Sequence, residues 1–220
     1  MLSKINHNRP TRVLDLACGT GLVIFALARS ADSRSLLVGL DPSSSMLRSA
    51  SRRKRAIRAR CSLELVQAVG EFMPFRNGSF EYETVGLALR NFGDKLAMFV
   101  EAYRTLIDSG WFLSVDFVLP DKPLTKGLYL FHIFNVLPNL GRLVSSSWRR
   151  TLTYLARSIQ LSQPPEETAK MLLGCGFRHT FFDKVTLGIV AVLGGQKWSE
   201  MDPKLSISND AKSSLELGGS

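Results

Sequence analysis

Residues 11–21 read TRVLDLACGTG, a short apolar run that passes directly into a glycine-containing turn. Leucine and β-branched residues dominate positions 11–17, as in a buried strand, and the turn occupies positions 18–21. Residues 22–29 (LVIFALAR) are then apolar on all sides, which is typical of a helix packed on a sheet. The stretch therefore predicts a strand, a glycine turn and a helix, and this unit decides the fold.

Strand and helix patterns alternate along the next part of the chain. Further buried strands are predicted at residues 35–40, 63–68, 82–89 and 111–119, with helices after Pro42 and at about 94–107. This alternation predicts the α/β class, with a doubly wound, mostly parallel sheet and helices on both faces. In that class, ligands bind outside the carboxyl ends of the strands.

The pattern changes beyond Pro120. A helical, aromatic-rich stretch predicts a lid at about residues 120–160, and a further helix begins near residues 164–167 (PPEE). Two final strands are predicted at residues 177–183 and 185–193. Because only about one residue, Lys184, separates them, they predict an antiparallel hairpin that completes a seven-stranded, Rossmann-like sheet.

One domain with an appended tail accounts for the length of 220 residues. We assign residues 1–197 to the domain, including the lid. Residues 198–220 are predicted to be a disordered tail, because they are rich in Ser, Asn, Asp and Gly and show no periodicity.

The composition, with 45% hydrophobic and 21% charged residues, excludes a globally disordered chain. Three widely separated cysteines favour a reducing compartment, and no metal site is predicted. The first residues lack the apolar core of a signal peptide, and the apolar stretch at 127–138 is shorter than the roughly 20 residues that cross a bilayer. We therefore expect a cytoplasmic protein.

The glycine turn and the end of the second strand carry the local signal for a ligand. Gly19 and Gly21 allow close approach of the backbone to a ligand, although such a turn also serves plain helix-on-strand packing. Asp41 lies where a carboxylate can accept hydrogen bonds from both ribose hydroxyls, or can cap the helix after Pro42. No third glycine completes a pyrophosphate seat. Asp15 instead suits a ligand with a positively charged amino-acid end.

These residues resemble the motif of class I S-adenosylmethionine-dependent methyltransferases. Downstream, residues 68–75 (AVGEFMPF), 77–80 (NGSF) and 89–92 (LRNF) with Asp94 are similar to the signature of the UbiE-like C-methyltransferases of ubiquinone and menaquinone biosynthesis. The resemblance runs from Arg12 to about residue 197. It continues at residues 103–106 (YRTL), 116–117 (DF), 134–141 (FNVLPNLG), 154–159 (YLARSI) and 188–191 (GIVA).

The resemblance implies S-adenosyl-L-methionine as cofactor and assigns its contacts. Four residues of the first strand and turn would hold the methionine and ribose part, and Asp41 would hold the ribose diol. Three residues would lie near the adenine, and Gly86 would end the fourth strand beside the cofactor. The residues of the first strand and turn are Asp15, Gly19, Thr20 and Gly21, and those near the adenine are Met46, Val69 and Gly70.

Three positions depart from the pattern that the resemblance implies. The family usually has Asp or Asn where this chain has Val69, which leaves only backbone groups to bond the adenine amino group. Leu22 replaces a common Asp, and Gly86 replaces a small hydroxyl residue. Each lost hydrogen bond is expected to weaken cofactor binding about fivefold. The family also carries helix before the first strand, where this sequence has eleven residues before Arg12.

The resemblance also implies methyl transfer to a ring carbon of a polyprenyl quinol that resides in the membrane. We expect Arg90 and Asn91 to touch the quinol oxygens, with Arg90 stabilising the developing phenolate. The alternative for Arg90 is an ion pair with Asp94 or Asp116. Asp116 itself suits either proton transfer or a salt bridge that anchors the lid. His132 suits proton transfer or a partly buried structural role.

Two further patterns concern the partner. The spacing of Leu128, Phe131, Phe134 and Leu137 fits either an isoprenoid groove or plain core. Seven basic residues lie between Arg48 and Arg60 in a chain of net charge +9. They suit a solvated helix face, or peripheral contact with an anionic membrane.

Rival functions remain open from the sequence alone. These are methylation of RNA or another small molecule, and a catalytically impaired cofactor-binding scaffold. Nucleic acid is disfavoured, because no aromatic residues for base stacking are interleaved with the basic residues. A homodimer also stays open.

Overall fold

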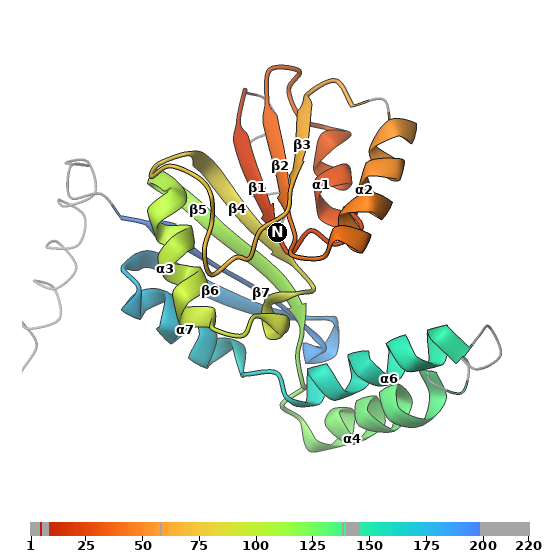
Figure 1. The fold of residues 1–220 in the computed structure, drawn as a ribbon. Helices are drawn as coiled ribbons and strands as arrows, with labels where there is room; N and C mark the ends of the chain where they lie inside the picture. Colours follow the sequence, from red (N-terminus) through yellow and green to blue (C-terminus); the bar gives the residue numbers. More distant parts are fainter. Residues whose placement is uncertain (1–4, 6–8, 58, 138, 140–145, 199–220) are drawn as a thin grey trace, which may run out of the picture.

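The computed structural model describes residues 5, 9–57, 59–137, 139 and 146–198 (Figure 1). Its centre is a seven-stranded sheet in the order β3-β2-β1-β4-β5-β7-β6. The strands are β1 (Arg12–Leu16), β2 (Leu36–Leu40), β3 (Ser62–Val66), β4 (Phe80–Gly86), β5 (Leu106–Phe117), β6 (Phe177–Val185) and β7 (Val190–Lys197). Strands β1 to β5 are parallel, and β7 runs antiparallel to β5 and β6. The predicted fold class is confirmed.

The strand order places the functional edge of the sheet. From β1 the chain winds outward through β2 and β3, and then returns to add β4 on the other side of β1. The carboxyl ends of β1 and β4 therefore flank the point where the winding direction reverses. Open α/β sheets bind ligands in the crevice at such a point.

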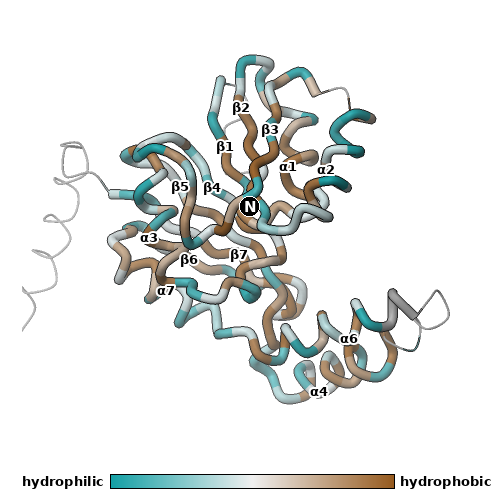
Figure 2. Tube along the Cα trace, viewed as in Figure 1, coloured by the Kyte–Doolittle hydropathy of each residue, from teal (hydrophilic) through white to brown (hydrophobic). Residues whose placement is uncertain are grey.

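Two apolar layers cover the sheet because successive strand residues point to opposite faces. Val13 faces a core built with helices α1 (Leu22–Ala28) and α2 (Ser44–Ala56). Leu14 faces the other core, built with α3 (Lys95–Thr105) and α7 (Pro165–Gly174). Figure 1 shows these two helix pairs on opposite sides of the sheet, and Figure 2 shows hydrophobic residues concentrated along the strands between them.

A helical arm projects beyond the sheet from the end of β5 (Figure 1). We use "arm" for helix α4 (Pro123–Phe131), the π-helical turn η3 (His132–Val136) and helix α6 (Ser146–Gln160). The arm has a small core of its own around Ile133, Ala156 and Ile159. Its helices lie where the sequence predicts a lid, and closure over a ligand stays a prediction.

The turn of the C-terminal hairpin differs from the prediction. Strand β6 continues through Lys184 to Val185, and the chain reverses at η4 (Thr186–Gly188). Lys184 belongs to the strand because it pairs with Ala191 of β7, and its Nζ also forms ion pairs with Asp121 at 2.8 Å and Glu166 at 2.9 Å. Gly188, with φ of 83°, supports the reversal instead.

Strand β5 also begins earlier than predicted, at Leu106, which pairs with Phe80 before the register shifts. The predicted tail lies outside the described residues, apart from Trp198. Within the described part of the chain, no helix has the length and apolar character needed to cross a membrane.

Candidate functional site: a cleft at the carboxyl edge of the sheet

The glycine turn after β1 adopts backbone conformations that favour glycine. Gly19 and Gly21 have φ of 55° and 85°, and Ala17 also has a positive φ, of 52°. A Cβ on Gly21 would lie 2.2 Å from the ring of Phe25, so this glycine is required for the packing of α1. A Cβ on Gly19 would meet nothing within 4 Å, so Gly19 borders open space. The two glycines therefore have different roles.

The carboxylate of Asp41 ties the end of β2 to this turn. Its Oδ2 accepts a 2.8 Å hydrogen bond from the Gly19 amide, and its Oδ1 accepts a 2.8 Å bond from the Ser43 amide. Asp41 is only 7% exposed. It does not cap α2, because Ser43 occupies the N-cap position and accepts from the Met46 amide. The predicted capping role therefore belongs to Ser43.

A cleft of about 460 Å³ opens in front of these residues. Six of the predicted site residues line it, from four different segments: Gly19, Asp41, Met46, Val69, Gly70 and Asn91. Met46 and Val69 are each 45% exposed, which places apolar surface beside the buried carboxylate. A cleft that places the fixed carboxylate of Asp41 beside apolar side chains has chemistry that suits a nucleoside.

The Leu-Arg-Asn segment forms the 3-10 turn η2 (Leu89–Asn91) and joins the cleft to the arm. Asn91 lines the cleft, and its Oδ1 accepts a 3.1 Å hydrogen bond from the Tyr154 hydroxyl on α6. Arg90 donates from Nε to Ser158 Oγ, also on α6, at 3.0 Å. Two consecutive residues of η2 therefore bond residues one turn apart on the arm.

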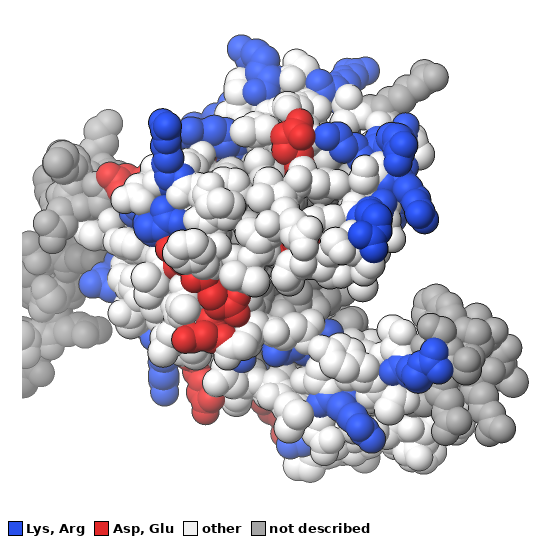
Figure 3. All heavy atoms as spheres, in the orientation of Figure 1, with Lys and Arg blue, Asp and Glu red and all other residues white. Residues whose placement is uncertain are grey.

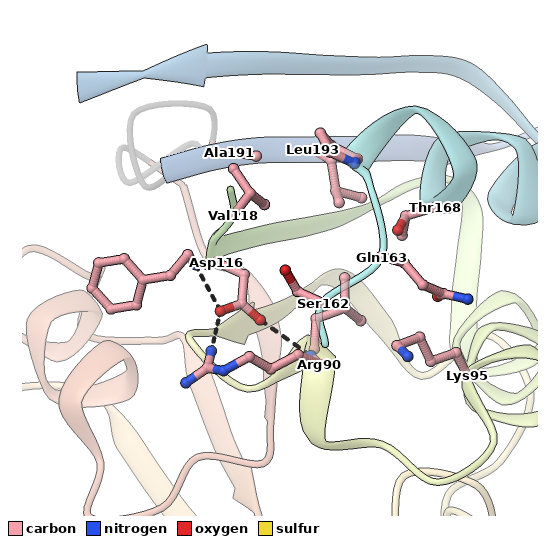
Figure 4. A pocket seen from close by; sticks show the side chains of 12 residues that line it. Arg90, Lys95, Asp116, Val118, Ser162, Gln163, Thr168, Ala191 and Leu193 are labelled. Carbon is pink, nitrogen blue, oxygen red and sulfur yellow. Dashed lines mark hydrogen bonds and ion pairs between the residues drawn. The ribbon is translucent and has the colours of Figure 1, made fainter. Parts of the chain in front are cut away.

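Arg90 and Asp116 form a buried ion pair, with side chains 7% and 9% exposed. Figure 4 shows the two side chains pointing toward one another. Arg90 also donates from Nη1 to the Leu87 carbonyl at 2.8 Å. Burial raises the pKa of Asp116, and the Arg90 guanidinium opposes that rise.

The surroundings of this ion pair bear on its predicted role. Arg90 and Asp116 line a cavity of about 30 Å³, which is far too small for a quinol ring, and they do not line the larger cleft. The geometry agrees with the alternative in which Arg90 pairs with Asp116. Contact of Arg90 with a quinol oxygen stays a prediction.

Asp15 lies beneath the glycine turn. It is 1% exposed, and its Oδ1 accepts a 2.9 Å hydrogen bond from the Thr84 hydroxyl on β4. Burial raises its pKa to about 7, and the Thr84 bond opposes the rise. Asp15 does not border the cleft. In this geometry its carboxylate does not contact a ligand in the cleft, and it acts on one only by supporting the glycine turn.

Thr20 and Gly86, two further predicted residues, also lie outside the cleft lining. Thr20 is exposed and bonds the guanidinium of Arg53 through its carbonyl and hydroxyl oxygens, at 3.1 and 3.2 Å. A Cβ on Gly86 would lie 2.3 Å from Cγ2 of Val23, so Gly86 lets α1 pack against the end of β4. Gly21 likewise serves helix packing.

His132 is exposed on η3 and borders neither cavity described above. The expectation of a partly buried histidine is therefore wrong, because the arm buries Ile133 instead. The four apolar residues predicted as a groove or core, at positions 128, 131, 134 and 137, do not lie on one surface. Phe134 and Leu137 pack into the core of the arm, whereas Leu128 and Phe131 are 63% and 61% exposed.

Comparison with known proteins shows which family the chain belongs to. The sequence pattern of the ubiE/COQ5 methyltransferase family matches residues 1–197. The chain belongs to the ubiE/COQ5 methyltransferase family. It is 36% identical over 189 residues to the UbiE ubiquinone/menaquinone biosynthesis C-methyltransferase of Xylella fastidiosa strain M23, covering 85% of this chain and 74% of that one. It is 31% identical over 182 residues to UbiE of Blochmanniella floridana, covering 82% and 71%.

Solved structures share the methyltransferase fold at lower identity. A SAM-dependent methyltransferase from Aquifex aeolicus superposes with a TM-score of 0.61 at 12% identity, covering 89% of this chain and 87% of that one. A SAM-dependent methyltransferase from Methanosarcina mazei gives a TM-score of 0.59 at 17% identity, covering 90% and 96%. These structures support the fold alone.

Other residues of the family-like motifs support the cleft from behind. Arg104, within residues 103–106, donates to the Phe75 carbonyl at 2.7 Å and to the Met73 carbonyl at 3.1 Å, and it pairs with Glu101. These bonds fix the loop that follows Gly70. The motif around Arg104 therefore holds the cleft wall without bordering the cleft.

Sequence reasoning missed several residues of the cleft and its connection to the arm. Phe92 and Glu71 line the cleft beside predicted residues, and their adjacency to Asn91 and Gly70 was the available signal. A Cβ on Gly70 would lie 2.5 Å from the Phe92 ring, which explains the glycine. Tyr154 and Ser158 lie more than 60 residues from their partners, and the family-like stretch 154–159 marked their segment without giving either residue a role.

Proposed function

We propose that this protein is an S-adenosylmethionine-dependent C-methyltransferase that methylates the ring of a polyprenyl quinol. The observation that carries the proposal is the position of Asp41. Its buried carboxylate lies in the wall of the cleft and is oriented by the Gly19 amide of the glycine turn. The names of the UbiE relatives supply the substrate class.

The residues of the cleft fit the cofactor. Gly19 leaves space in front of the turn, where a methionine moiety can approach the backbone. Each oxygen of Asp41 accepts one backbone bond and keeps acceptor capacity for a ribose hydroxyl. Met46 and Val69 offer apolar contact to an adenine ring. Bound there, the cofactor would supply an electrophilic methyl group on its sulfonium.

Binding and alignment are the tasks left to the chain. Methyl transfer to a ring carbon depends on holding that carbon in line with the methyl group, so positioning supplies most of the catalysis. Asn91 is the predicted residue best placed to touch the quinol. Its Oδ1 accepts from Tyr154, which leaves its amide N–H groups as the donors for a quinol oxygen.

Arg90 and Asp116 act as positioning residues in this proposal. The ion pair holds η2 against β5 through the Arg90 amide and side chain, while Ser158 connects it to the arm. The positive charge of the guanidinium is largely compensated by Asp116. Its contribution to phenolate stabilisation is therefore expected to be smaller than its contribution to the placement of Asn91.

A methyl-transfer assay tests the proposal. Purified protein and methyl-labelled S-adenosylmethionine are incubated in three separate reactions, each with one acceptor. The acceptors are a demethylmenaquinol, a ubiquinol precursor that lacks the ring methyl, and total RNA. Label in a quinol product supports the proposal and identifies the ring. Label only in RNA would replace it with the rival methyltransferase function. Cofactor binding without label in any acceptor would favour the scaffold.

A further inference from the structure

The outer face of α4 carries a stripe of exposed apolar side chains. Leu124, Leu128 and Phe131 are 78%, 63% and 61% exposed and lie about one helical turn apart. The opposite face of the same segment packs into the core of the arm through Tyr129, Leu130 and Ile133. Figure 2 shows hydrophobic colouring along α4. The helix is therefore apolar on the face that the arm does not bury.

The position of α6 directs this stripe away from the cleft. Tyr154 and Ser158 of α6 bond η2 of the main domain, so α6 lies between the domain and α4. Figure 1 shows α4 on the far side of α6 from the sheet. The stripe thus forms an outer surface of the molecule and lines neither of the cavities at Arg90 or Asp41.

The segment that contains the arm has basic residues and no acidic ones. Between Lys122 and Gln160 there are six basic residues and no Asp or Glu. Among the residues whose side chains are described, the exposed basic ones in this segment are Lys122, Lys126, Arg150 and Arg157. The nearest preceding acidic residue, Asp121, is paired with Lys184. Blue side chains on the arm in Figure 3 illustrate this charge.

We infer that the arm docks on an anionic lipid bilayer, with Leu124, Leu128 and Phe131 inserted at the level of the headgroups and upper acyl chains. An apolar helix face on a basic element is the physical signature of interfacial binding. Anionic headgroups complement the charge of the arm. A second copy of the chain would instead bring an equally positive arm against the first. The inference rests on the proposed function to the extent that a prenylated substrate resides in the same bilayer.

The basic helix α2 is a weaker membrane surface than the arm. Arg53 bonds the glycine turn and stacks over the Phe25 ring, and Lys54 pairs with Glu64 at 3.6 Å. The exposed large apolar residue of α2, Met46, lines the cleft. Helix α2 thus offers charge without an outward apolar stripe. Contact through Arg48 to Arg60 stays a separate prediction.

Vesicle co-sedimentation tests the inference without substrate or cofactor. The protein is mixed with phosphatidylcholine vesicles, with or without phosphatidylglycerol, at low and high salt. We expect binding to the anionic vesicles, and at least a tenfold loss of it in the Leu128→Ser/Phe131→Ser variant, because two large apolar side chains no longer insert. Leu96→Ser/Val100→Ser is the matched control, since those residues are 51% and 55% exposed on α3. It should bind like the wild type.

A second readout reports insertion depth. The wild type has three tryptophans, so quenching by vesicles with brominated acyl chains is measured as the difference from the wild type. Phe131→Trp should add a quenched component, and Leu96→Trp should add an unquenched one. Equal vesicle binding by the two serine variants would overturn the inference. So would a change in the lipid-free molecular mass caused only by Leu128→Ser/Phe131→Ser, because it would make the stripe an interface between copies.

Methyl transfer to a short-chain quinol in solution separates this inference from the proposed function. Vesicle binding that depends on the stripe, without methyl transfer by the wild type, would support the inference and contradict the proposed function. Methyl transfer without vesicle binding would overturn the inference and leave the proposed function standing.

Discussion

The hydroxyl of Tyr154 on α6 donates a 3.1 Å hydrogen bond to Oδ1 of Asn91, a residue that lines the cleft. The bond joins residues 63 positions apart in the chain. It links the arm to the part of the site where we place the quinol. The arm therefore influences the orientation of the Asn91 amide directly, in addition to presenting its outer stripe.

Removal of the Tyr154 hydroxyl should impair methyl transfer more than cofactor binding. In Tyr154→Phe, the Asn91 amide loses its orienting partner, and one hydrogen bond corresponds to about a fivefold effect. We expect kcat/KM for the quinol to fall about fivefold, with the Kd for S-adenosylmethionine unchanged. Tyr103→Phe is the control, because the Tyr103 hydroxyl bonds the Trp198 carbonyl on another part of the domain. Equal kinetics in both variants would contradict the role of Tyr154.

Loss of the Arg90 guanidinium should destabilise the protein, because Asp116 would be left as an uncompensated buried carboxylate. Breaking a buried pair in this way costs about 3 kcal/mol or more. We expect Arg90→Gln to lower the free energy of unfolding by about that amount in urea denaturation. Arg90→Gln/Asp116→Asn should recover much of the loss, since it removes the stranded charge.

Turnover by the same two variants separates placement from contact with the quinol. If Arg90 only positions η2, the double variant should regain turnover together with stability. Recovery of stability without turnover would show that the guanidinium itself touches the reacting quinol. Turnover by Arg90→Gln equal to that of the wild type would contradict both roles.

Stability should decline as pH rises toward 8, because of the buried carboxyl of Glu83. Burial raises the pKa of Glu83 to about 8, although its Oε1 accepts a 2.5 Å bond from the Thr105 hydroxyl. Its ordinary pKa in the unfolded chain is near 4.5. Between these values the folded state binds more protons than the unfolded state, so the free energy of unfolding falls as pH rises, by up to about 1.4 kcal/mol per pH unit.

Glu83→Gln should remove this contribution and raise stability at pH 8 relative to the wild type. Denaturation at pH 5 and pH 8 measures the difference. Glu81→Gln, on the same strand, is the control, because the pKa of Glu81 is shifted in the opposite direction and the substitution should not raise stability at pH 8. Burial works to raise the pKa of Glu81, but its hydrogen bonds from Arg12 outweigh burial and lower the pKa. A steeper decline with pH in Glu83→Gln would contradict the assignment.

Much of the fold was predictable because its signals are local. The apolar strand, the glycine turn and the buried helix at residues 11–29 lie next to one another in the chain, and the alternation continues through Leu106. Gly19, in the glycine turn after the first strand, and Asp41, at the end of the second, were both predicted, and they are joined in the structure. The carboxyl ends of parallel strands necessarily meet at one edge.

The remaining features depend on partners that are distant in sequence. The bond between Asp15 and Thr84 spans 69 positions, so nothing near Asp15 shows that it is 1% exposed. Lys184 pairs with Ala191 of β7, and its ion-pair partners Asp121 and Glu166 come from two other segments. The exposure of Phe131 follows from the packing of α6 against the other side of the arm. Sequence periodicity predicts that these apolar residues share one helix face, but it does not predict whether that face packs against protein or lies at the surface.

Calorimetric titration of S-adenosylmethionine into the wild type and Asp41→Asn tests the central claim most directly. We predict saturable one-to-one binding by the wild type, and at least tenfold weaker binding by Asp41→Asn, because the variant loses the charged acceptor in the cleft wall. Asp121→Asn, which alters the salt bridge at the base of the arm, should bind like the wild type. Equal affinity in all three proteins, or no heat with the wild type, would contradict the claim that this cleft binds the cofactor.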